Sequence, residues 1–188
     1  MNKLAEEILD FWTDVGMEGW YTESAEFDDK IRSRYKAIWT DALDGKYSDW
    51  KLDAKSSLAL IILLDQFPRN MFRGDEASFA SDRKALCVAK KAIERNFDMQ
   101  IEGDMRQFFY LPFMHSECLK DQDAAVRAFC TRMPGTSNLL HARAHRQVIR
   151  DFGRFPYRND ALSRESTGKE VSYLNAGGYR FTVENIEQ

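Results

Sequence analysis

The sequence predicts an all-α protein built from antiparallel helix pairs, with about seven to nine helices. Apolar residues recur at helical spacing from Leu4 onward, and no strand signal of convincing length precedes the C-terminal tail. In addition, Pro68, Pro112 and Pro156 follow one another at intervals of 44 residues. This interval lies within the usual period of stacked helix pairs, so we expect a helical repeat.

The length of 188 residues and the apolar fraction of 44% suit one domain with a substantial core. We expect a single helical domain over residues 1–175, followed by a tail over residues 176–188 that is extended or frayed. The net charge of −3 argues against a nucleic-acid-binding protein. The longest apolar run, residues 58–64, is too short to cross a membrane, and the N-terminus lacks an apolar signal region.

The three cysteines are odd in number and form no CxxC pair. Such usage is typical of buried thiols in a reducing compartment rather than of a disulfide framework. We therefore expect a cytoplasmic protein.

The first two helices are predicted from their apolar positions. Leu4 to Trp12 carries apolar residues on one helical face, and Gly16 and Gly19 mark the turn that follows. A longer helix over residues 27–42 ends near Gly45, a typical C-terminal cap.

The stretch Leu58–Gly74 organises the middle of the chain. Its first seven residues are apolar on every side, which is typical of a helix in the centre of a fold. Pro68 disfavours helical geometry at Phe67, so we expect the buried helix to bend or stop there.

Five further helices are predicted after Gly74. The first has Leu86, Ala89 and Ile93 on its apolar face and Asn96 as its cap. The Thr167–Glu170 segment is a capping-box pattern that opens the last one. The expected ranges are 81–95, 102–112, 126–133, 140–152 and 167–174.

Polar residues cluster around the three prolines, where apolar helices end. Polar groups in such a setting must be hydrogen-bonded or paired, so they form either a structural lock or a site. Arginine dominates residues 127–164, with eight arginines, no lysine and two aspartates, a net charge of +6. Arginine without lysine indicates use of the guanidinium fork on carboxylates or phosphates.

The leading functional hypothesis is a pocket for a small anionic ligand, with the protein as a possible enzyme. Its arginines would hold the anion, and His115 with Glu117 or Asp65 would be the acid–base candidates. The ten candidate residues are Asp65, Arg69, Asn70, Arg73, His115, Glu117, His145, Arg154, Arg158 and Asn159.

No cofactor or metal is predicted. His141 and His145 have the spacing of a chelating pair, but Ala142 occupies the place of the glutamate in a metalloprotease helix. The sequence also lacks a phosphate-binding glycine loop, a nucleophile elbow and a dinucleotide-binding fingerprint.

Two alternatives remain open. In the first, Asp65, Glu117, Asp160 and Glu170 neutralise the arginines, and the motifs form a structural lock. In the second, the protein is a tetratricopeptide-like scaffold that binds a protein or peptide on a concave face. An open groove formed by the exposed aromatic residues Trp12, Trp20, Trp50 and Tyr157 would favour the scaffold.

Five segments resemble the blocks of a bacterial family, the domain of unknown function 924. They are residues 58–74, 110–117, 121–122, 152–159 and 164–170, and the resemblance extends from Asp10 to Leu174. It implies a helical fold of the tetratricopeptide-like superfamily, a right-handed array, and no established activity. Tyr157 stands where the family often has histidine, and Ser163 where it often has glycine. The first departure removes one candidate acid–base group.

Overall fold

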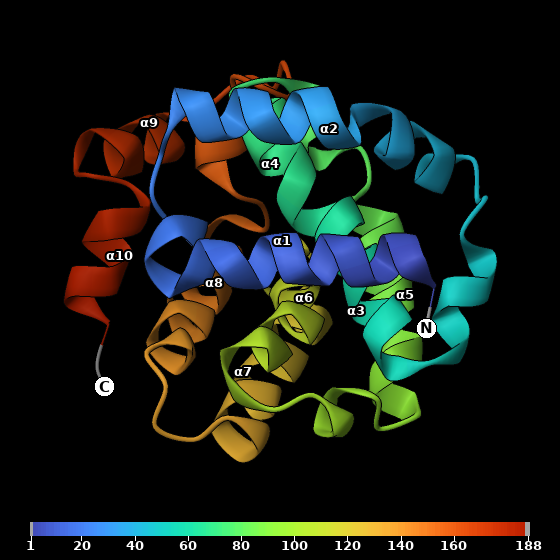
Figure 1. Ribbon diagram of the computed structural model, residues 1–188. Helices are drawn as coiled ribbons and strands as arrows, with labels where there is room; N and C mark the ends of the chain where they lie inside the picture. Colours follow the sequence, from blue (N-terminus) through green and yellow to red (C-terminus); the bar gives the residue numbers. More distant parts are fainter. Residues whose placement is uncertain (1, 187–188) are drawn as a thin grey trace. The chain divides into compact units, whose positions relative to one another are not determined.

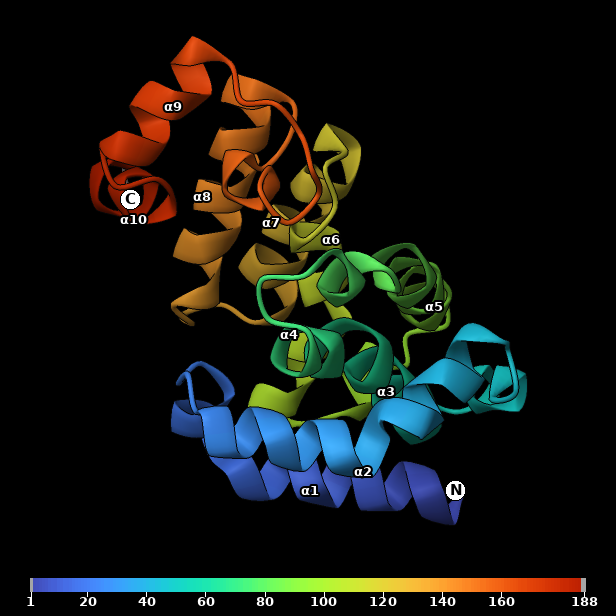
Figure 2. The same ribbon diagram turned by 90° about the horizontal axis from the view of Figure 1, so that it is seen from above.

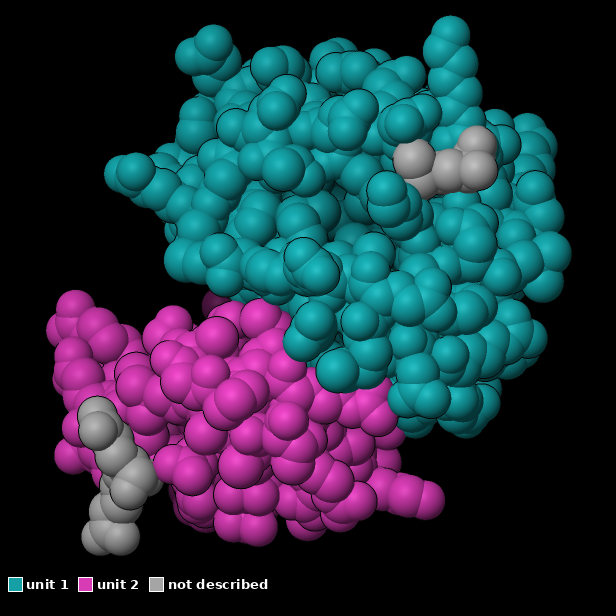
Figure 3. Space-filling model, turned by 60° about the horizontal axis from the view of Figure 1, so that its bottom comes forward, with its two compact units in different colours: residues 1–112 teal, residues 113–188 magenta. Residues whose placement is uncertain are grey.

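The computed structural model describes residues 2–186, which form helices joined by loops and contain no strand (Figure 1). The predicted all-α fold is confirmed. The chain divides into two compact units, residues 1–112 and 113–188, which are coloured separately in Figure 3. The single domain over residues 1–175 and the right-handed tetratricopeptide-like array stay predictions.

The first unit is built from helices that pack in pairs. α1 and α2 run antiparallel in both ribbon views (Figures 1 and 2). α1 packs against α3, α2 against α4, and α3 against α5. The elements are α1 (Lys3–Trp20), α2 (Ala25–Leu43), α3 (Ala54–Ile61), α4 (Phe67–Met71) and α5 (Asp82–Glu94), with 3-10 helices at Ser48–Leu52, Glu76–Phe79, Asp98–Gln100 and Gly103–Phe109. The short α6 (Leu111–Met114) spans the division between the units.

Local capping residues fix the bounds of α1 and α2. The side chains of Asn2 and Ser24 accept hydrogen bonds from backbone N–H groups in the first turns of α1 and α2. Gly16 interrupts α1 with a φ of 67°, and Gly45 follows α2 with a φ of 84°. Both glycines adopt the left-handed conformation that other residues avoid, which explains the predicted turn and cap.

The central apolar run is the buried core of the first unit. Every residue from Leu58 to Leu64 is at most 2% exposed. The helix was expected to bend or stop at Phe67. It does not stop there, because a π-helical turn, Ile62–Gln66, connects α3 to α4. Phe67 stays helical, with φ −58° and ψ −39°, and Pro68 lies in the first turn of α4. A proline is tolerated there because the first N–H groups of a helix need no intrahelical partner.

Aromatic rings surround this central helix. The ring of Phe67 lies 5.5 Å from Trp12, 4.6 Å from Tyr35 and 6.0 Å from Phe11, measured between centroids. Phe108 completes the cluster at 5.8 Å from Trp12. All five side chains are buried, so the core of the first unit is mainly aromatic where the helices meet.

The second unit centres on the helix pair α7 (Leu119–Arg132) and α8 (Asn138–Phe152), which pack against each other. Val148, Ile149 and Phe155 form a buried cluster. The remaining elements are a 3-10 turn at Pro156–Arg158, α9 (Gly168–Asn175) and α10 (Tyr179–Asn185). The capping box predicted at Thr167 and Glu170 is present and opens α9.

Four expectations from the sequence are corrected: the tail, the helix at 102–112, the buried face of α5 and the burial of the cysteines. The tail is helical over Tyr179–Asn185 and packs against α8, while residues 187 and 188 lie outside the described part of the chain. The helix expected at 102–112 is a 3-10 helix, Gly103–Phe109.

The buried face of α5 consists of Ala85, Val88, Ala89 and Ala92 rather than Leu86 and Ile93. Small residues fill this face because α3 packs closely on it. The cysteines at 87, 118 and 130 are exposed free thiols, not buried ones.

Among residues 2–186, every helix is too short or too polar to cross a lipid bilayer.

Candidate functional site

The ten predicted site residues fall into two groups, one in each unit. Four of them lie in the first unit, in the π-turn, α4 and the loop after it, and six lie in the second.

Asp65 lies in the π-helical turn and is fully buried. The amide of Gln66 donates to its Oδ2 at 2.5 Å, and Arg69 donates to its backbone carbonyl. The Arg69 guanidinium also lies 3.5 Å from Asp65 Oδ1 and 3.0 Å from Asp82 Oδ1. Arg69 is therefore held between two carboxylates, one from the π-turn and one from α5.

Asn70 and Arg73 both bind Asp28, which is buried on α2. Asn70 Nδ2 donates to Asp28 at 2.8 Å, and Arg73 donates through Nε at 2.9 Å and through a second nitrogen at 3.1 Å. Burial acts to raise the pKa of Asp28, but the hydrogen bonds from Arg73 and Asn70 outweigh it and leave the pKa below its usual value. This cluster fastens α4 to α2.

Glu117 and Arg164 form an equivalent pair in the second unit. Glu117 Oε1 accepts from Arg164 at 2.8 Å and from the backbone N–H of Phe155 at 2.9 Å. Burial acts to raise the pKa of Glu117, but these two hydrogen bonds outweigh it and lower the pKa. The carboxylate thereby connects three loops of the unit.

Arg154 binds Glu170 through both carboxylate oxygens, at 2.6 and 2.8 Å. Glu170 also accepts from the backbone N–H of Thr167 at 2.7 Å, as part of the capping box. The hydrogen bonds from Arg154 and Thr167 lower the pKa of Glu170 to about 2. Of the four carboxylates expected to neutralise arginines, Asp65, Glu117 and Glu170 do so, whereas Asp160 makes no ion pair among residues 2–186.

The histidines gather around Tyr179, a residue of α10. His141 Nδ1 lies 2.8 Å from the Tyr179 hydroxyl, and the ring of His145 lies 4.6 Å from that of Tyr179. His145 Nδ1 lies 2.9 Å from the carbonyl of His141, so it carries the proton of the neutral ring. His115 lies 6.3 Å from His145 between ring centroids. Burial, together with the charge of His115, lowers the pKa of His145 to about 3, so its ring is neutral at pH 7.

Arg158 and Asn159 complete the predicted set. The Arg158 guanidinium lies over the ring of Phe155, 4.6 Å from its centroid. Asn159 is buried, and its amide donates to Ser166 Oγ at 3.0 Å. No group of three or more histidine, cysteine, aspartate or glutamate side chains with metal-binding geometry occurs among the described residues.

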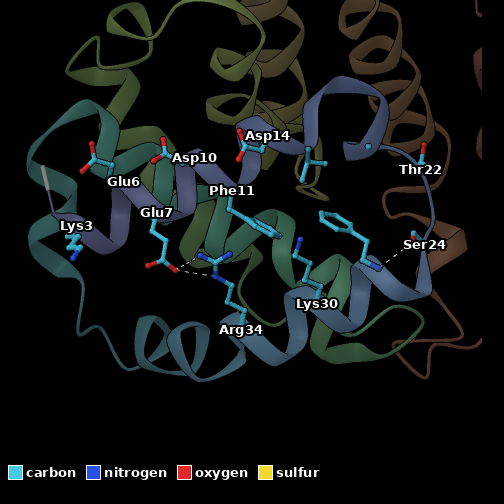
Figure 4. A pocket seen from close by; sticks show the side chains of 13 residues that line it. Lys3, Glu6, Glu7, Asp10, Phe11, Asp14, Thr22, Ser24, Lys30 and Arg34 are labelled. Atoms are coloured by element: carbon cyan, nitrogen blue, oxygen red, sulfur yellow. Dashed lines mark hydrogen bonds and ion pairs between the residues drawn. The ribbon is translucent and has the colours of Figure 1, made fainter.

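A groove lies between α1 and α2, away from the predicted residues. It encloses about 770 Å³. Phe11 lies in it and stacks on Phe27 at 5.9 Å between centroids. In Figure 4, Glu7 turns toward Arg34 on α2, to which it is bound at 2.8 Å.

The opposite edge of the groove is acidic. Glu6, Asp10 and Asp14 follow one edge of α1 in Figure 4 and are exposed. They make no ion pair among residues 2–186. The basic side chains Lys30 and Arg34 lie 5.5 and 5.3 Å from the ring centroid of Phe11. The groove thus has an aromatic floor between an acidic edge and a basic edge.

The sequence matches the family described as bacterial protein of unknown function (DUF924) over residues 8–178. The chain belongs to this family. A solved structure, that of the protein of unknown function ATU0120 from Agrobacterium tumefaciens, is 41% identical to it with a TM-score of 0.88. The match covers 93% of this chain and 98% of that one. No curated protein matches the sequence.

These comparisons establish family and fold for this DUF924 chain, and they name no activity. One of the two expected departures is at Ser163, which has a φ of 51°, a conformation that glycine adopts without strain. The other departure, Tyr157, is 40% exposed and stacks on Phe155 at 5.3 Å between centroids.

Several residues of these clusters escaped the sequence analysis. Asp28 and Asp82 are distant in sequence from the arginines they bind, and nothing local marks them. Tyr179 lies in the segment 176–188, which the sequence predicts to be a tail, but it belongs to α10. The acidic edge alone has a sequence signal, since Glu6, Asp10 and Asp14 recur every four residues and therefore share one helical face.

Proposed function

We propose that the protein is a binding module that holds a segment of a partner protein in the groove between α1 and α2. The observation that carries the proposal is the combination of a volume of about 770 Å³ with an aromatic floor and edges of opposite charge. Helical proteins commonly bind an amphipathic segment by covering its apolar face in such a groove.

Charge complementarity supports a basic amphipathic segment as the occupant. Glu6, Asp10 and Asp14 repel one another at helical spacing, and a cationic partner would relieve this repulsion. The basic edge is already partly neutralised, because Arg34 is bound to Glu7. An apolar side chain of the segment would cover Phe11 and Phe27, and its lysines or arginines would face the acidic edge.

The tryptophans do not contribute to this groove. Trp12 and Trp50 are buried, and Trp20 stacks on Trp12 at 6.2 Å. The groove between α1 and α2 is therefore not the groove of tryptophans and Tyr157 that the sequence suggested for a scaffold. It is lined by phenylalanine and charged residues of the first helix pair.

The test is selection from an array of random peptides of about twelve residues, a length that forms roughly three helical turns. The selected peptides should be enriched in lysine or arginine at positions four apart, with an apolar residue between them. Asp10→Lys should abolish the enrichment. Asp49→Lys, an equal charge change at an exposed site outside the groove, should not. Absence of enrichment, or an identical selection by Asp10→Lys, would refute the proposal.

The ten-residue anion pocket remains a hypothesis without further support. Its four arginines were expected to hold the anion. They are Arg69, Arg73, Arg154 and Arg158. The first three are instead bound to carboxylates. This pairing favours a structural role for those three side chains.

A further inference from the structure

We infer that the second unit has a binding site for a small dianion on the face of α8 that carries Arg143 and Arg146. This site lies outside the predicted ten residues and is independent of the groove between α1 and α2. It accounts for the arginine-rich composition of residues 127–164, which the carboxylate pairs described above absorb only in part.

The site is a hollow of about 500 Å³ between α8 and the end of α10. Its lining is Arg143, Arg146, Gln147, Asn185 and Ile186. Four of these five side chains carry N–H donors and none carries a carboxylate. Positions 143, 146 and 147 share one helical face, because residues three and four apart are neighbours on a helix.

The arginines of this face outnumber the carboxylates that neutralise them. Arg146 lies 3.2 Å and Arg150 lies 3.9 Å from the same oxygen of Asp123, a residue of α7. Arg143 makes no ion pair among residues 2–186. Two guanidinium groups therefore share one carboxylate and the third has none, which leaves two positive charges along the face.

Arg146 also has hydrogen-bonding capacity to spare. Its Nε is buried and has no hydrogen-bond partner in the described part of the chain. A buried N–H without a partner is costly, and an anion would remove that cost if the Arg146 side chain turned its Nε into the hollow. Two further carboxylates lie near the hollow or its lining residues in sequence: Asp151 accepts from Gln147 at 3.0 Å, and Glu184 pairs with Arg180.

A ligand with two negative charges matches these observations. Phosphate and carboxylate oxygens both suit the planar fork of a guanidinium group, which can donate two parallel hydrogen bonds. The hollow exceeds the size of a single anionic group, and Ile186 offers an apolar contact, so the anion would be carried on a small organic molecule.

The experiment is a titration followed by NMR of the arginine Nε–H signals, with inorganic phosphate as the probe and sodium chloride holding the ionic strength constant. We expect saturable shifts at Arg143 and Arg146 and none at Arg127, an exposed arginine of α7 outside the hollow. Malonate forms the second arm. Saturation by both anions indicates a site for dianions in general, and saturation by phosphate alone indicates one for phosphate groups.

Two variants complete the test. Arg143→Gln removes a guanidinium that has no ion pair to lose, and it should weaken phosphate binding about tenfold or more. Arg127→Gln makes the same charge change away from the hollow and should leave binding unchanged. Shifts that rise linearly without saturation, shifts equal at Arg127, or wild-type binding by Arg143→Gln would each overturn the inference.

Discussion

The hydroxyl of Ser81 donates a 2.5 Å hydrogen bond to the backbone carbonyl of Leu64. This carbonyl lies four residues before Pro68, whose missing N–H would bind it in a regular α-helix. The Ser81 oxygen in turn accepts from Trp39 Nε1 at 3.0 Å. A side chain from another part of the chain thus supplies the donor that the proline lacks, at the point where the π-turn leads into α4.

Ser81→Ala should therefore destabilise the protein by about 1–3 kcal/mol. The substitution leaves the Leu64 carbonyl and the Trp39 N–H unsatisfied in the core, and buried unsatisfied groups cost this much. Urea denaturation measures the effect. Ser33→Ala, which removes an exposed hydroxyl on α2, is the control and should change stability by less than about 0.5 kcal/mol. Equal effects of the two substitutions would contradict the role given to Ser81.

Arg69→Ala should lower the free energy of unfolding by about 3 kcal/mol, because it removes the cation between Asp65 and Asp82. The measurement is again urea denaturation, with Arg83→Ala as the control at an exposed position of the same unit. A variant of wild-type stability would mean that Arg69 is not part of a structural lock. In that case Arg69 would again be a candidate ligand-binding residue.

Stability should fall as the pH drops from 7.5 to 5, in part because of His145. Its pKa is about 3 in the folded protein, against 6.5 for an ordinary histidine. Between these values the unfolded chain binds a proton that the folded chain excludes, so the free energy of unfolding decreases on acidification. One such group contributes up to about 1.4 kcal/mol per pH unit.

His145→Phe keeps a ring against Tyr179 but cannot titrate, so its stability should depend less on pH over this range. His141 stays in place and retains part of the slope, since burial lowers its pKa as well. Asp28 and Glu117, whose pKa values are lowered, act only at more acidic pH. An unchanged slope in the variant would show that His145 is protonated as readily in the folded protein as in the unfolded one.

Ser163→Gly should stabilise the protein by roughly 0.5–1 kcal/mol. Relief of the left-handed backbone strain at φ 51° gains more than the greater flexibility of glycine costs in the unfolded chain. Thermal denaturation followed by circular dichroism would detect the increase. Gly153→Ala, which places a side chain at a φ of 71°, should have the opposite effect and serves as the reference.

Features with a local cause were predictable from the sequence. The helical spacing of Leu4, Ile8 and Trp12 predicted α1, and the left-handed Asn96 and Gly153 end helices where a cap was expected. The π-turn was not predictable, because the donor that satisfies its Leu64 carbonyl is Ser81, seventeen residues away. The sequence singled out the polar residues at the helix ends correctly as buried or bound.

The partners of these residues could not be inferred in the same way. Asp28 binds Arg73 across 45 positions of the chain, and Glu117 binds Arg164 across 47. Such pairs arise from tertiary packing, which one sequence does not encode in any local pattern. The dianion site had only its arginine excess as a signal, since the hollow exists only where α10 packs near α8.

The aromatic core has a spectroscopic consequence. All four tryptophans, at positions 12, 20, 39 and 50, belong to the first unit, and the second unit has tyrosine and phenylalanine but no tryptophan. Indole fluorescence therefore follows the unfolding of residues 1–112 and is silent on the rest, whereas far-ultraviolet dichroism follows the helices of both units. Two midpoints would reveal that each unit melts on its own, and one shared midpoint that the protein unfolds as a single cooperative body.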